Sequence, residues 1–206
     1  MPVQFLLKGI VIGFSIAAPV GPIGVLCIRR SLAEGRLVGL ATGLGAATAD
    51  AIYGCLAGFG LTAISTFLVN QRVWLGLFGG LFLCYLGART LLRKPSDEAA
   101  APGKSNSSSA YLTTLFLTLT NPMTILSFVA VFAGFGLGSS PDYFSAVTLV
   151  AGVFIGSAAW WLLLSSSVAL LRHKLSLAWM SAVNRLSGTI ILAFGIYALV
   201  STARTL

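Results

Sequence analysis

The segment FSAVTLVAGVFIGSAAWWLLLSSSVALL, residues 144–171, contains no charged side chain. An α-helix needs about 20 apolar residues to cross the roughly 30 Å hydrocarbon core of a bilayer, so this segment predicts a transmembrane helix. The rest of the chain has the same character, because 57% of its 206 residues are hydrophobic and only 9% are charged. Soluble domains carry roughly a quarter of charged residues. The composition therefore excludes a soluble globular protein.

Six segments are apolar and long enough to span a membrane. They cover residues 4–28, 37–68, 73–92, 111–137, 144–171 and 186–203. We expect an all-α membrane protein with six transmembrane helices in a single domain, residues 1–206. A polar, serine-rich stretch predicts a linker at residues 93–110, between a first half, residues 1–92, and a second half, residues 111–206. Halves of three helices would have opposite topology, so we expect two inverted three-helix repeats.

Basic residues are divided unevenly between the two sides of the predicted bundle. Of the 13 lysines and arginines, ten fall in the first, third and fifth connections, with Arg29 and Arg30 in the first, and three fall on the other side. Because basic connections stay in the cytoplasm, we expect the linker inside the cell and both termini outside. The basic residues punctuate apolar runs instead of forming a cluster. The net charge of +8 therefore does not indicate a nucleic-acid surface.

Prolines interrupt two of the predicted spans. Pro19, Gly21 and Pro22 break the first span, and Asn121 with Pro122 breaks the fourth. A proline inside a helix removes a backbone donor and frees polar backbone groups, which cannot face lipid. Each break is either a simple kink or a pair of half-helix ends that hold a substrate or ion. A break in each half favours a binding site.

Asp50 is the only carboxylate deep inside a predicted span. Placing it at the bilayer centre costs about 2.5 to 3.5 kcal/mol on insertion scales, so we expect it to face the bundle interior. It either binds a coupling ion, H⁺ or Na⁺, or is a neutral, hydrogen-bonded structural group. Tyr53 lies about one turn away on the same helix face and is a second candidate. Asn121 either recognises a polar group of the substrate or caps the following half-helix.

The three cysteines, Cys27, Cys55 and Cys84, lie far apart in apolar stretches. A membrane thiol oxidoreductase needs a reactive cysteine pair, so this class is disfavoured. A metal-ion exporter is also disfavoured, because the spans hold one carboxylate and no histidine. We expect no metal, no cofactor and no enzymatic activity. A metal-ion or other small-solute exporter, a thiol oxidoreductase and a purely structural subunit are the alternatives.

Two further features concern packing. Ser157, Trp160, Trp161 and the serines at 165–167 place hydroxyls and aromatic faces in the fifth span, where they either pack or attract a substrate ammonium. Glycine pairs four residues apart, such as Gly9 with Gly13, let helices approach closely. Such pairs serve contacts within one chain or between two, so they are compatible with a homodimer.

Taken in order, these features resemble the LysE/RhtB amino-acid exporter family over essentially the full chain. The likeness rests on the Pro-x-Gly-Pro break at 19–22, the glycine-rich stretch from Gly35 to Asp50, and Asn121-Pro122. The resemblance implies a secondary exporter of amino acids or similar small metabolites in the bacterial cytoplasmic membrane. It implies these site positions: Pro19, Gly21, Pro22, Asp50, Asn121 and Pro122. Members often carry polar or basic residues where this chain has Ile23, Gly24 and Met123, which leaves neutral amino acids or another small solute open.

Overall fold

The computed structural model describes residues 2–19, 21–58, 71–92, 106–121, 124–125, 127–128, 143–171 and 177–204. Within these ranges the chain forms seven helices and no strand, which confirms the all-α class. The helices are α1 (Pro2–Ala17), α2 (Pro22–Ala33), α3 (Arg36–Gly58), α5 (Arg72–Leu92), α7 (Ser107–Leu119), α9 (Tyr143–Leu171) and α10 (Leu177–Ala203).

Three helices in the described ranges are long and apolar enough to cross a membrane. These are Val73–Leu92, Tyr143–Leu171 and Ser181–Ala203. A fourth candidate is the pair formed by α1 and α2, which is bent by 81° at the break. The first predicted span is therefore two helices that meet at a steep angle. The total of six spans and the inverted repeats stay predictions.

Two predicted boundaries are wrong. The sixth span starts earlier than residue 186, because α10 begins at Leu177. The linker was predicted to end at Ala110, but it ends earlier, because α7 begins at Ser107. Asn106 caps that helix by accepting a hydrogen bond from the backbone N–H of Ser108 at 3.0 Å, which satisfies one of the free first-turn amides. Residues 93–105 of the predicted linker lie outside the described residues.

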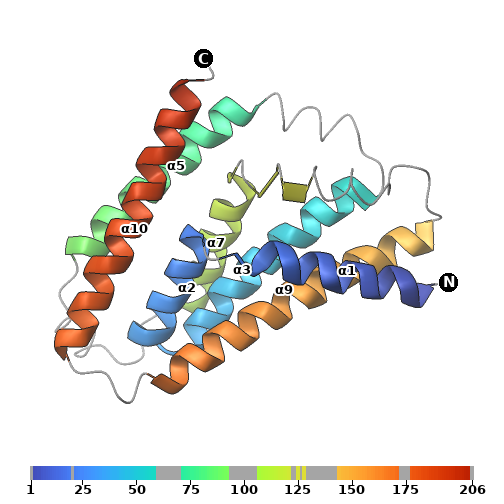
Figure 1. The fold of residues 1–206 in the computed structure, drawn as a ribbon, viewed down its shortest axis with the longest axis horizontal. Helices are drawn as coiled ribbons and strands as arrows, with labels where there is room; N and C mark the ends of the chain where they lie inside the picture. Colours follow the sequence, from blue (N-terminus) through green and yellow to red (C-terminus); the bar gives the residue numbers. More distant parts are fainter. Residues whose placement is uncertain are drawn as a thin grey trace.

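Glycines bring α1 and α9 into backbone contact (Figure 1). A Cβ added at Gly13 would meet the backbone of Val153, and one added at Gly156 would meet the backbone of Ile10. Close backbone approach is the usual role of small residues between membrane helices. These glycines therefore serve packing inside one chain, and the predicted homodimer needs another surface.

Helices α5 and α10 form a second close pair at one side of the molecule (Figure 1). A Cβ added at Gly195 of α10 would meet Cys84 of α5, so glycine sets this approach as well. The pair joins the remaining helices through a buried apolar cluster to which α2 and α7 also contribute. Its members are Leu26, Leu86, Leu117 and Ile191.

Candidate substrate-binding cavity

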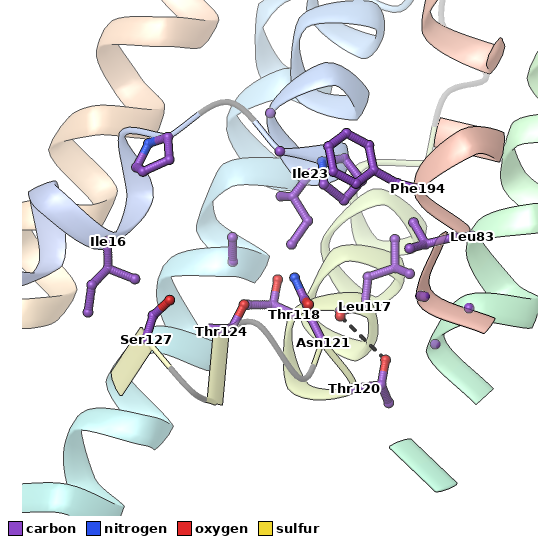
Figure 2. Close-up of a pocket in the computed structure, with 18 of the residues that line it drawn as sticks. Ile16, Ile23, Leu83, Leu117, Thr118, Thr120, Asn121, Thr124, Ser127 and Phe194 are labelled. Atoms are coloured by element: carbon purple, nitrogen blue, oxygen red, sulfur yellow. Dashed lines mark hydrogen bonds between the residues drawn. The ribbon is translucent and has the colours of Figure 1, made fainter. Parts of the chain in front are cut away.

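A cavity of about 440 Å³ is bordered by the α5–α10 pair on one side and by α2, α3 and α7 on the other (Figure 2). It collects residues that are far apart in the sequence. Five of the predicted site residues line it, namely Pro19, Gly21, Pro22, Asp50 and Asn121. Pro122 lies outside the described residues. The structure thus brings the first proline break, Asn121 of the second break and the carboxylate of the predicted second span to one space.

The first wall of the cavity is the amino end of α2. Pro22 is the first residue of this helix, and Gly21 precedes it in an extended conformation, with φ −99° and ψ −165°. No side chain caps the helix at Gly21. The amides of Ile23 and Gly24 belong to the first turn, where N–H groups have no partner within the helix. Both residues line the cavity, so a helix end of positive polarity faces it.

The second wall is the carboxyl end of α7. Thr118, Thr120 and Asn121 line the cavity there, and Figure 2 shows Thr118 beside Asn121. The hydroxyl of Thr118 donates to the carbonyl of Thr114 at 2.8 Å, and that of Thr120 donates to Phe116 at 2.8 Å. Each hydroxyl proton is therefore used within the helix, and the oxygen remains an acceptor. The carbonyl of Asn121 accepts from the backbone N–H groups of Thr124 at 3.1 Å and Ile125 at 3.3 Å, so a further helical turn starts there. The threonine oxygens remain as acceptors, so this wall can bind a cation.

Asp50 lines the same cavity from α3. Its side chain is only 3% exposed. The hydroxyl of Ser157 donates to Oδ2 of Asp50 at 2.7 Å, and Nε1 of Trp161 donates to the Ser157 oxygen at 3.2 Å. Within the described ranges no Lys, Arg or His forms an ion pair with Asp50. A buried carboxyl group, held by a two-member hydrogen-bond chain, thus lines the cavity.

Tyr53, the remaining predicted site residue, does not line the cavity. Its hydroxyl donates to the carbonyl of Leu119 at 2.6 Å, and its ring packs against Phe128 with 5.5 Å between ring centroids. Leu119 is the last residue of α7, where carbonyls have no partner within the helix. Tyr53 therefore fixes the end of α7 next to Asn121 rather than contacting the cavity itself.

The fifth predicted span supplies a more specific contribution than its residue types suggested. Ser157 and Trp161 hold Asp50, whereas Trp160 packs edge-on against Phe14 with 5.3 Å between ring centroids. The hydroxyls of the lining were not predicted as site residues. A signal for them exists in the sequence, because they are Ser and Thr side chains in otherwise apolar spans. They are Thr118, Thr120, Thr124, Ser127, Ser201 and Thr202.

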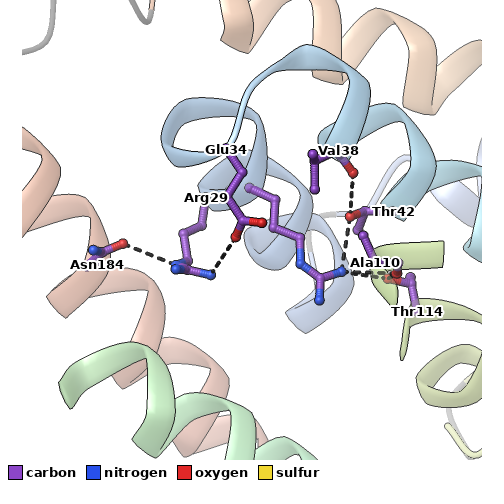
Figure 3. A network of polar contacts seen from close by, with 8 residues as sticks. Arg29, Glu34, Val38, Thr42, Ala110, Thr114 and Asn184 are labelled. Atoms are coloured by element: carbon purple, nitrogen blue, oxygen red, sulfur yellow. Dashed lines mark hydrogen bonds and ion pairs between the residues drawn. The ribbon is translucent and has the colours of Figure 1, made fainter. Parts of the chain in front are cut away.

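Two arginines lie buried toward the other end of α2, and neither lines the cavity. Arg30 is 9% exposed. Its Nη1 donates to the Thr42 hydroxyl and the Ala110 carbonyl, both at 3.1 Å, and to the Thr114 hydroxyl at 3.3 Å (Figure 3). Arg30 was expected in a cytoplasmic connection. That expectation is wrong, because its guanidinium joins α2 to α3 and α7.

Arg29, expected in the same connection, is 4% exposed and faces a different neighbour. Its Nε donates to Oδ1 of Asn184 at 3.1 Å, and its Nη1 lies 3.5 Å from Oε1 of Glu34 (Figure 3). Asn184 belongs to α10, so this contact is a polar tie between the α5–α10 pair and α2. Two adjacent arginines thus hold α2 to three different helices.

Comparison with known proteins supports the resemblance seen in the sequence. The family model described as LysE type translocator matches residues 14–202. The chain is 29% identical over 196 residues to the "Putative amino acid efflux protein YcgF" of Bacillus subtilis (strain 168), with 93% of each chain covered. It is 28% identical over 176 residues to the "Uncharacterized membrane protein YahN" of Escherichia coli (strain K12), covering 84% of this chain and 77% of that protein. No solved structure matches the chain.

Proposed function

Because the chain belongs to the LysE type translocator family, we propose that it is a secondary exporter that carries an amino acid across the cytoplasmic membrane. Membership makes the protein a transporter rather than an enzyme, which removes the thiol oxidoreductase alternative. One observation carries the choice of substrate. The amino end of α2, the threonine oxygens at the carboxyl end of α7 and a buried carboxyl group line the same cavity.

This arrangement suits a zwitterion. The first-turn amides of Ile23 and Gly24 are placed to bind a carboxylate, because a helix amino end supplies donors and positive polarity together. Asp50 and the threonine oxygens at the carboxyl end of α7 are placed to bind an ammonium group. A simple anion would satisfy only the first wall, and a simple cation only the second. An α-amino acid carries both charges on one small unit.

Asp50 also couples substrate to an ion in this proposal. A buried carboxylate without a positive partner is costly, so its charge must be neutralised in each state of the cycle. The substrate ammonium does this on the outward leg, and a proton does it on the return leg. Because both bind the same carboxylate, they exclude one another, and substrate exit requires proton entry. The membrane potential then contributes about 2.3 kcal/mol per 100 mV for each proton that enters.

We infer the access pathway from the two groups of helices around the cavity, which are the α5–α10 pair and the remaining helices. Rocking of the α5–α10 pair against the remaining helices would open the cavity at one end and close it at the other. The tie between Arg29 and Asn184 would hold one of those ends closed. We retain the orientation derived from the basic residues, with the linker in the cytoplasm and both termini outside.

The test is efflux from proteoliposomes loaded with labelled amino acids. An acidic outer medium should accelerate efflux by the wild-type protein. Asp50→Asn should insert and fold but not respond to the gradient, whereas Asp97→Asn, which removes a carboxyl group in the predicted linker, should respond. A response to a sodium gradient instead of a pH gradient would replace the proton by Na⁺. Unchanged gradient-driven efflux by Asp50→Asn would refute the coupling role.

A further inference from the structure

We propose that the cavity selects amino acids whose side chains carry no charge, an inference that rests on the zwitterion site proposed above. This selectivity follows from the charged residues that line the cavity. Asp50 is the one Asp, Glu, Lys, Arg or His among the described residues that line the cavity. If Asp50 holds the α-ammonium group of the substrate, no second carboxylate is present for the side chain of lysine or arginine.

For an acidic substrate side chain, the cavity lacks a cationic partner. The amides at the start of α2 are occupied by the α-carboxylate, so the side chain of aspartate or glutamate would need a cation elsewhere. The nearest cations along α2 are Arg29 and Arg30, and neither lines the cavity. Their guanidinium groups bind Asn184 on one side and Thr42 on the other. An acidic substrate would therefore place its side-chain charge against described residues that offer no cation, which is unfavourable.

The remaining surface of the cavity is suited to an uncharged side chain. Leu83 of α5 and Phe194 of α10 face it from the same side in Figure 2. Leu117 of α7 lies close to Leu83 in that view and lines the cavity too. Gly79 and Gly80 also belong to this wall, and they let α5 approach Thr120 and Leu199 closely, because an added Cβ would meet those residues. An apolar substrate side chain gains from burial against this wall, whereas a charged one loses its hydration there.

Leu83 and Phe194 are accordingly the specificity-determining residues of this proposal. They belong to the α5–α10 pair, whereas Asp50 and the two helix ends belong to the other helices. The α-amino and α-carboxylate groups of the substrate would then be held by the other helices, and its side chain by the α5–α10 pair. A substrate side chain that packs against the apolar wall therefore helps to draw the α5–α10 pair towards the remaining helices.

Competition in proteoliposomes tests the selectivity of the wild-type protein. Unlabelled leucine, methionine, valine and threonine should each inhibit exchange of a labelled neutral amino acid. Lysine, arginine, glutamate and aspartate should each need at least about ten times the concentration, which corresponds to the loss of one charge partner. Equal inhibition by lysine or glutamate would overturn the selectivity and leave the exporter intact. Absence of exchange with every amino acid would instead refute the proposed function.

A matched pair of variants tests the wall directly. Leu83→Asp and Leu83→Asn introduce side chains of almost equal size that differ in charge. Leu83→Asp should improve inhibition by lysine about tenfold relative to Leu83→Asn. Ser201→Asp and Ser201→Asn provide a second pair at an exposed, already polar position of the lining, in case the first pair does not fold. Equal lysine inhibition within each folded pair would contradict this origin of the selectivity.

Discussion

Substitution of Ser157 by alanine should weaken substrate binding without unfolding the protein. Its hydroxyl donates to Oδ2 of Asp50 at 2.7 Å, and Asp50 is 3% exposed, so the bond is shielded from water. A hydrogen bond to a charged group contributes about 1.5 to 3 kcal/mol. Since about 1.4 kcal/mol is a tenfold change in affinity, the Kd for the substrate should rise about 10-fold to 100-fold. The reason is that Ser157→Ala removes a hydrogen bond that stabilises the ionised carboxylate, so a proton competes more strongly with the ammonium group for Asp50.

The assay is equilibrium binding of a labelled amino acid to purified protein, together with thermal unfolding in the same detergent. Ser165→Ala is the matched control. Ser165 is buried on the same helix, two turns further on, and its hydroxyl donates to the Leu162 carbonyl at 3.3 Å. It does not line the cavity, so the Kd should stay within about twofold of wild type. A folded Ser157→Ala protein with wild-type affinity, or equal losses in both variants, would refute the reasoning.

Two further predictions concern stability, measured as the Tm of the purified protein. Tyr53→Phe should destabilise by about 1 to 3 kcal/mol, because the Leu119 carbonyl loses its buried donor; an unchanged Tm would show that water replaces the hydroxyl. Gly156→Ala should destabilise by about 1 to 3 kcal/mol or prevent folding, because its Cβ overlaps the Ile10 backbone. Gly54→Ala is the control, since its Cβ would meet side chains only at 3.7 Å; equal losses in both variants would contradict this packing.

The features that could be predicted from the sequence are residues that are unfavourable in their local surroundings. Pro19 and Pro22 cannot continue a helix, and a carboxylate such as Asp50 is unfavourable in lipid, so each can be located without a partner. Long uncharged runs are equally local. The spans predicted at 73–92 and 144–171 therefore differ from α5 and α9 by one residue at their starts.

The features that the sequence missed depend on partners far along the chain. Arg29 and Arg30 follow an apolar run, as loop residues do, and their burial requires acceptors more than ten residues away. Asn184 falls just before the sixth span predicted from residue 186, yet it belongs to α10 and its side chain accepts the bond from Arg29. Tyr53 has the spacing of a partner for Asp50, but its hydroxyl meets Leu119, 66 residues later. In each case the sequence showed the residue type, but it did not show the residue with which the side chain interacts.

The pairing of Asp50 with Ser157 is the same kind of contact, over a separation of 107 residues. The notable serines and tryptophans of the fifth predicted span could be identified as polar and aromatic. Nothing local distinguishes Trp161, which supports this pair, from Trp160, which packs on Phe14. The two roles depend on how α9 packs on its neighbours, and Gly152 and Gly156 bring it into backbone contact with α1.

Proton release on substrate binding tests most directly whether substrate and proton share Asp50. Purified protein in weakly buffered detergent solution is mixed with a neutral amino acid, and the pH change is followed from weakly acidic to weakly alkaline conditions. We predict that binding releases a proton in part of this range, and that Asp50→Asn releases none. Substrate binding by the wild-type protein without proton release at any pH, or equal release by Asp50→Asn, would contradict a shared carboxylate.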